Sequence, residues 1–165
     1  MPLVQEINSG DDLLAYQAQL RETLCAGGTI GMALGITEQE CEALYQFGHG
    51  FYAQGRYSEA FQVFSTLVGY DHLEPRYLVA LAAAAQMLGR YEDALQHYGT
   101  AALLTLDDPA PLVHSAECCL ALGQHEGAVE ALELAIELID QEPRHEALRP
   151  RVEALLESLN HPQAV

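Results

Sequence analysis

Three segments of this chain align at a spacing of 34 residues. Each has a glycine in one column and an alanine five residues later: Gly55, Gly89 and Gly123, then Ala60, Ala94 and Ala128. Bulky side chains occupy two more columns: Tyr57, Tyr91 and His125, then Phe64, Tyr98 and Leu132. A unit of this length cannot bury its own apolar face, so the period indicates supersecondary units that stack on one another.

A small residue, an aromatic, an alanine and a second bulky residue at these offsets are typical of the tetratricopeptide repeat, a helix-turn-helix unit. We therefore expect an all-α fold, a tetratricopeptide-repeat solenoid of three helix-turn-helix repeats with an N-terminal helix and a C-terminal capping helix. Stacked repeats leave a concave surface that suits an extended peptide. The first hypothesis is therefore a binding protein.

Composition narrows the class of partner. The chain has 165 residues, half of them hydrophobic, and a net charge of −17 with only seven basic residues. A nucleic-acid phosphate backbone or an anionic membrane needs clustered Lys and Arg, so neither is an expected partner. The length predicts one domain in which the repeats share a continuous core.

The sequence also suggests a compartment. No apolar run approaches the eighteen or so residues of a spanning helix, and residues 1–10 lack the pattern of a signal peptide. The cysteines have no metal-type C-x-x-C spacing; they are Cys25, Cys41, Cys118 and Cys119. We expect reduced cysteines that act as small core residues, and a cytoplasmic protein.

The N-terminal part precedes the repeats. Leu13, Tyr16, Leu20 and Leu24 have helical spacing and predict a helix over residues 11–25. Thr37 and Glu40 form the pattern of a capping box, which opens the first repeat. We expect three segments: 1–36 with the N-terminal helix and linker, 37–140 with the repeats, and 141–165 with the capping helix and tail.

Within the repeats each glycine marks a turn between two helices. The helix pairs are predicted at 37–54 and 58–69, 75–88 and 92–106, and 109–122 and 126–140. A proline follows each glycine by 20 residues, near the start of a helix where a missing amide donor costs little. An apolar stripe from Leu148 to Leu159 predicts the capping helix, and residues 161–165 are expected to form a frayed tail.

Helix faces separate core positions from binding positions. Gly48, Ala82 and Ala116 on the first helices are small enough for close packing and are assigned to the core with the alanine column. The first helix of each repeat is expected to line the concave surface. Its positions there are Tyr45, His49 and Tyr52 in repeat one, Val79, Ala83 and Gln86 in repeat two, and Val113, Glu117 and Leu120 in repeat three.

Further aromatics extend this predicted groove: Tyr57, Phe64, Tyr70 and Tyr98. For Tyr57, Phe64 and Tyr98, which occupy repeat columns, the sequence leaves core and groove equally open. A tyrosine ring buries a large apolar area while its hydroxyl bonds a ligand carbonyl, so the groove suits peptide capture.

Other functions are less well supported by the residues. His114 is one turn from Glu117 and Cys118, but local sequence offers no third or fourth metal ligand, so no metal or cofactor is expected. A general tetratricopeptide scaffold that reads a C-terminal carboxylate remains the alternative function, although Arg76 is the only basic residue near a groove face. No catalytic motif is present, so an enzyme is not expected.

Three stretches resemble one particular family. They are LYQFGHGFYAQGRYSEAFQVFSTL (44–67), YDHLEPRYLVALAAAAQMLGRYEDAL (70–95) and DPAPLVHSAECCLALG (108–123). The resemblance covers residues 27–140, including GGTIGMALGI before repeat one, and H-S-A-E-C-x-L is its most specific part. The family is the class II chaperones of bacterial type III secretion systems.

The resemblance implies a cytoplasmic, non-enzymatic chaperone that binds the hydrophobic translocator subunits before export and prevents premature association and degradation. It implies that Tyr45, His49, Tyr52 and Tyr57 match groove aromatics, and that Tyr70 and Tyr98 match cargo-binding positions. It also implies that the helix carrying Leu13, Tyr16, Leu20 and Leu24 is a dimerisation segment of a homodimer.

Overall fold

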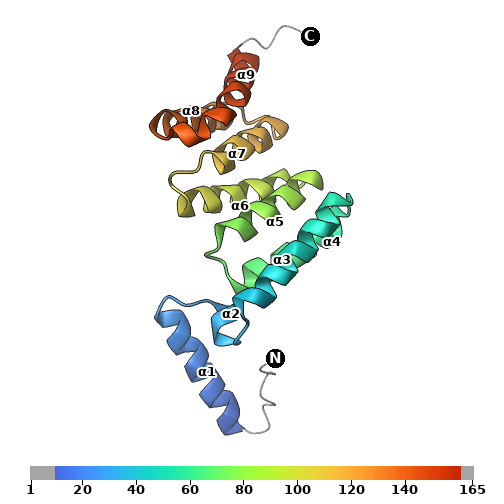
Figure 1. Ribbon diagram of the computed structural model, residues 1–165, viewed down its shortest axis with the longest axis vertical. Coiled ribbons are helices and arrows are strands. Elements are labelled where there is room, and N and C mark those ends of the chain that lie inside the picture. The colour runs from blue at the N-terminus through green and yellow to red at the C-terminus, as the bar shows by residue number, and fades with distance from the viewer. Residues whose placement is uncertain (1–9, 161–165) are drawn as a thin grey trace. The chain divides into compact units, whose positions relative to one another are not determined.

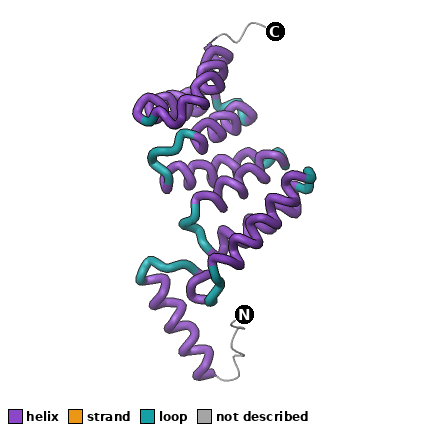
Figure 2. Tube along the Cα trace, in the orientation of Figure 1, coloured by secondary structure: helices purple, strands orange, loops and turns teal. Residues whose placement is uncertain are grey.

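The structure, a computed structural model, describes residues 10–160, and this part of the chain is made of helices joined by loops (Figure 2). The chain divides into two compact units, residues 1–77 and residues 78–165. The division lies inside α5 (Pro75–Met87), so each unit is described by itself. The predicted three-segment division and shared core stay predictions.

Among its described residues, the first unit has four helices before α5 (Figure 1). They are α1 (Gly10–Cys25), α2 (Ile30–Ala33), α3 (Glu38–Ala53) and α4 (Tyr57–Tyr70). α3 and α4 pack as a helix pair, which is the predicted first repeat, and the short α2 packs against α1 and α4. The sequence predicted α1, α3 and α4 to within about two residues and missed α2.

The predicted capping box opens α3. The hydroxyl of Thr37 accepts the N–H of Glu40 at 3.2 Å, and the Glu40 carboxylate accepts the N–H of Thr37 at 2.9 Å. Because both bonds satisfy amides that have no partner within the helix, they fix where α3 begins.

The second unit continues the array from Leu78. Its later elements are α6 (Tyr91–Leu104), α7 (Ala110–Ala121), α8 (His125–Gln141), the 3₁₀-helix η1 (Pro143–Leu148) and α9 (Arg149–Asn160). α7 packs against both α6 and α8, and α9 packs on α8 (Figure 1). The capping helix therefore begins only after a 3₁₀ segment that the sequence did not predict.

The turn glycines behave as the repeat pattern predicts. Gly55, Gly89 and Gly123 have φ values of +74°, +72° and +72°, a conformation that side chains disfavour. The described residues contain no other positive-φ residues besides Gly27 and Gly35. The three turns thus have one geometry, imposed by one residue type.

The small-residue columns form the core. Ala60, Ala82, Ala94, Ala116 and Ala128 are fully buried, and Gly48 is buried. In the second unit the core around Ala128 also contains Leu132, Ile139 and Val152, so α9 covers an apolar face that would otherwise meet water.

The expectation for cysteines holds for three positions. Cys41, Cys118 and Cys119 are buried, whereas Cys25, expected in the core, is exposed at the end of α1. Within residues 10–160, no helix is both long and apolar enough to span a bilayer. The predicted tail at 161–165 and the start of the chain lie outside the described residues.

Candidate functional site

In the first unit, aromatic rings gather around Tyr45. Tyr45 and His49 are four residues apart on α3 and therefore share a face, with ring centroids 4.5 Å apart. Phe64 on α4 lies 6.0 Å from the ring of Tyr45 and 5.4 Å from that of His49. Tyr77 on α5 lies 5.6 Å from Tyr45. We call these four residues the aromatic cluster.

Within the aromatic cluster the residues differ in exposure. Phe64 and Tyr77 are buried, Tyr45 is half-buried and His49 is exposed. The buried rings support Tyr45 and His49, which face solvent in part. Phe64, for which the sequence left core and groove open, lies in the core.

Gly48 makes this arrangement possible. A Cβ at position 48 would lie 2.5 Å from Cε1 of Phe64, closer than side-chain carbons approach one another. The absent side chain lets Phe64 enter between α3 and α4, directly beneath Tyr45 and His49.

Arg76 stands over the aromatic cluster with its charge already paired. Its guanidinium lies 5.3 Å from the ring centroid of Tyr45, within cation–π range. Nη1 is 3.4 Å from Glu42, and Nε is 3.2 Å from Glu74. Two carboxylates therefore pair with the guanidinium of Arg76, which argues against its use in a carboxylate clamp.

The hydroxyls of Tyr45, Tyr52 and Tyr77 remain protonated at neutral pH. Burial raises the pKa of Tyr77 to about 12, and burial also raises the pKa values of Tyr45 and Tyr52. A protonated hydroxyl donates a hydrogen bond, and a peptide carbonyl can accept it.

The remaining predicted residues of this unit lie apart from the aromatic cluster. Tyr52 and Tyr57 form their own edge-to-face pair, with centroids 5.2 Å apart, and both are half-buried. Tyr70 is half-buried at the end of α4, where its backbone approaches Gly31 of α2.

In the second unit, polar side chains converge on Glu117 of α7. One carboxylate oxygen, Oε2, lies 3.2 Å from Nδ1 of His114 and 3.4 Å from Nε2 of Gln86. The other, Oε1, accepts a hydrogen bond from Arg151 of α9. The hydroxyl of Tyr98 donates to Oε1 of Gln86 at 3.0 Å. We call these five residues the polar network.

Packing and charge hold the polar network in place. The ring of His114 stacks on Tyr98, with centroids 5.2 Å apart and planes inclined by 18°. Burial would raise the pKa of Glu117, but hydrogen bonds from His114 and Arg151 and the charge of Arg151 outweigh it and lower the pKa to about 2. The carboxylate is therefore ionised at neutral pH and only accepts hydrogen bonds.

The structure separates the predicted groove residues of this unit. Gln86 and Glu117 come together in the polar network, and Val79, Ala83 and Leu120 are half-buried. Tyr98 and Val113 are each 1% exposed and belong to the core. Tyr98 thus takes the core alternative, as Phe64 does, and Val113 offers no surface to a ligand.

Sequence reasoning missed Tyr77 and Arg151. A signal for Arg151 was present: Arg76 pairs with Glu42 and Arg151 pairs with Glu117, and each pair is separated by one period of 34 residues. Equivalent positions of neighbouring repeats lie side by side, so opposite charges one period apart predict an ion pair. Tyr77 has no counterpart in the repeat columns, and no comparable signal identifies it.

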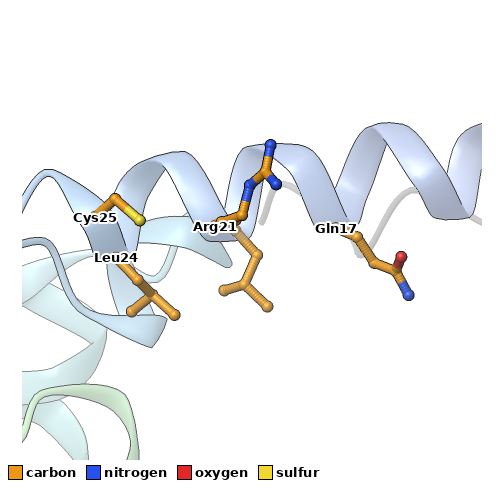
Figure 3. A pocket seen from close by; sticks show the side chains of 5 residues that line it. Gln17, Arg21, Leu24 and Cys25 are labelled. Atoms are coloured by element: carbon orange, nitrogen blue, oxygen red, sulfur yellow. The ribbon is translucent and has the colours of Figure 1, made fainter.

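α1 carries a shallow apolar pocket of about 450 Å³ (Figure 3). It is lined by Gln17, Leu20, Arg21, Leu24 and Cys25. In the close-up Gln17 and Leu24 point to the same side of the helix. Of the predicted dimerisation residues, Tyr16 and Leu20 are half-buried and Leu24 is 42% exposed, while the side chain of Leu13 lies outside the described residues.

No group of three or more His, Cys, Asp or Glu side chains capable of holding a metal ion occurs among residues 10–160. His114, considered as a ligand from the sequence, has its Nδ1 directed to Glu117 within the polar network.

Comparison with known proteins matches this chain both to a repeat family and to a protein of similar length. A family model described as tetratricopeptide repeat matches residues 85–152. The low calcium response locus protein H of Yersinia pseudotuberculosis is 34% identical over 148 residues, which cover 90% of this chain and 88% of that protein.

Of two similar solved structures, one contains a bound region of another protein and the other is a dimer. PcrH, a Pseudomonas aeruginosa protein solved with the chaperone binding region of PopB, is 39% identical with a TM-score of 0.70 and covers 73% of this chain and 98% of its own. The Yersinia enterocolitica type III secretion translocator chaperone SycD, solved as an alternative dimer, is 32% identical with a TM-score of 0.73 and covers 79% and 98%.

Proposed function

This chain belongs to the class II chaperones of type III secretion translocators, and from this we propose that it binds an extended segment of hydrophobic translocator proteins in the cytoplasm. Binding keeps such proteins soluble and competent for export. The segment lies on the first helices of the repeats. Each unit offers such a segment a contact surface of its own: the exposed parts of the aromatic cluster and Tyr52 in the first unit, and those of the polar network in the second.

One observation carries this assignment. The half-buried ring of Tyr45 is held by Phe64, Tyr77 and the guanidinium of Arg76, while part of it still meets solvent. A fixed aromatic surface binds an apolar side chain at low entropic cost, because its own rotamers are already restricted. Holding an unfolded segment in this way needs no catalytic group.

A translocator has apolar segments that would aggregate if left free in water. The net charge of −17 adds solubility to a complex with such a segment and disfavours acidic partners. The general scaffold alternative receives less support, because the basic residue nearest the aromatic cluster, Arg76, is neutralised by Glu42 and Glu74.

A homodimer is part of the proposal, with α1 as its surface. The relative SycD is described as a dimer. In this chain, support comes from the apolar pocket on α1 and the 42% exposure of Leu24 beside it. Burying this surface against a second copy would remove apolar area from water.

The test uses the chaperone binding region of PopB as the peptide, titrated into the full chain by calorimetry. Tyr45→Ala combined with Tyr52→Ala should weaken binding about tenfold or more, since a truncated aromatic anchor costs ~1–2 kcal/mol or more. Tyr45→Phe should bind nearly as the parent chain if the ring provides most of the affinity.

Tyr91→Ala is the matched control, because Tyr91 is a half-buried tyrosine of a repeat column outside the proposed contacts. Circular dichroism establishes that each variant keeps its helices. Unchanged affinity in the folded double variant would remove the aromatic cluster from the binding surface.

A further inference from the structure

The polar network contains hydrogen-bonding groups that its internal bonds leave unused. Nδ1 of His114 faces the carboxylate of Glu117, and in the ring tautomer that donates from Nδ1 the other ring nitrogen, Nε2, is an acceptor. Gln86 receives the hydroxyl of Tyr98 on Oε1 and gives one Nε2 hydrogen to Glu117. Within residues 10–160, neither the second Nε2 hydrogen of Gln86 nor Nε2 of His114 has a partner.

These two groups are close together because both side chains contact the same oxygen, Oε2 of Glu117, at 3.4 and 3.2 Å. Both side chains are partly exposed: the His114 side chain is 32% exposed, and Gln86 is half-buried. A donor and an acceptor side by side match the C=O and N–H that each residue of an extended peptide presents.

We infer that the polar network is a main-chain-binding subsite, in which Gln86 donates to a carbonyl and His114 accepts an amide N–H of the extended translocator segment. This inference rests on the proposed function and says which part of the ligand this surface reads. The subsite recognises backbone rather than side chains, so it accepts different translocator sequences.

The charges of the polar network argue against an anionic ligand. Arg151 would attract a carboxylate or phosphate, but Glu117 already pairs with it. Arg151 is thus a positioning residue: from α9 it holds the Glu117 carboxylate, which in turn orients His114 and Gln86. The C-terminal helix thereby shapes the binding surface as well as covering the core.

The test is a double-mutant cycle between the chain and the backbone of the peptide. The probe is the PopB chaperone binding region, synthesised as a series in which one backbone amide at a time is replaced by an ester. An ester lacks the N–H and is a weaker acceptor, while the side chains stay the same. Affinities are measured by calorimetry for the parent chain and for His114→Phe, which keeps the stack on Tyr98.

We expect one ester position to weaken binding to the parent about two- to tenfold, the effect of one hydrogen bond. The same ester should have no further effect in His114→Phe. Gln86→Leu should show the same loss of effect at a neighbouring position, and it supplies a second cycle if His114→Phe fails to fold. Arg149→Gln, on the same helix as Arg151 but paired with Asp140 and Glu146, should leave every ester effect unchanged.

Two results would overturn the inference. If the parent chain binds the peptide and no ester position couples to His114 or Gln86, the polar network only ties α9 to α7, and the proposed function stands. If the parent chain does not bind the chaperone binding region of PopB, the proposed function fails and the subsite with it.

Discussion

Substitutions at two glycines of α3, Gly48 and Gly50, would measure how much the packing beneath the aromatic cluster contributes to the free energy of unfolding. Gly48→Ala places a Cβ 2.5 Å from Cε1 and 3.0 Å from Cδ1 and Cζ of Phe64, a ring that is 1% exposed. Because the ring is buried in a packed core, the added Cβ should cost ~1–3 kcal/mol through overpacking. Alanine's better helix propensity returns ~1 kcal/mol, so the net loss should be ~0–2 kcal/mol.

Gly50→Ala is the matched control on the same helix. An added Cβ at Gly50 meets nothing within 4 Å, so this variant should gain ~0.5–1 kcal/mol from helix propensity alone. The difference between the variants, ~1–3 kcal/mol, is then the packing cost at Phe64. It should be visible in urea unfolding, and as roughly 2–4 °C in Tm for each kcal/mol.

The same pair of variants connects packing to binding. Displacing Phe64 moves the ring that supports Tyr45 and His49, so Gly48→Ala should also weaken peptide binding, whereas Gly50→Ala should not. Equal stabilities for the two variants would refute the reasoning, because they would mean that Phe64 yields without cost.

Glu117→Gln should be less stable than the parent by at most about 3 kcal/mol near neutral pH, because the folded pKa of Glu117 is lowered to about 2 from 4.5. That stabilisation is present above pH 4.5 and disappears toward pH 2, so the thermal-unfolding midpoints of the two chains should converge as the pH falls. A difference between the midpoints that stays the same at every pH would contradict this reasoning. Leu20→Asp with Leu24→Asp should shift the mass in light scattering toward monomer, while Ala15→Asp, on the opposite side of α1, should not; no shift would reject α1 as the dimer surface.

The repeat pattern predicted most of the fold because its columns reflect local requirements. A left-handed turn demands glycine at Gly55, Gly89 and Gly123, and close helix contact demands alanine or glycine in the core columns. These constraints recur every 34 residues and therefore reinforce one another. The short α2 and the 3₁₀ segment η1 lie outside the repeats, so no column predicts them.

The candidate site was harder to predict because its residues depend on which neighbours cover them. Periodicity places Tyr45 and Tyr98 on helix faces, but it does not tell that Tyr45 stays half-exposed while α7 covers Tyr98 with His114. Tyr77 and Arg151 contribute through contacts with other helices. Only the charge pairing across one period could have identified Arg151 in advance.

The ion pair between Glu117 and Arg151 has a consequence for changes in chain length. An α-helix turns by about 100° per residue, so inserting or deleting one residue within α9 before Arg151 would rotate its guanidinium off the side that meets Glu117. Homologous sequences should therefore vary the identity of the intervening residues more freely than their number, and insertions should accumulate where no such pair spans them.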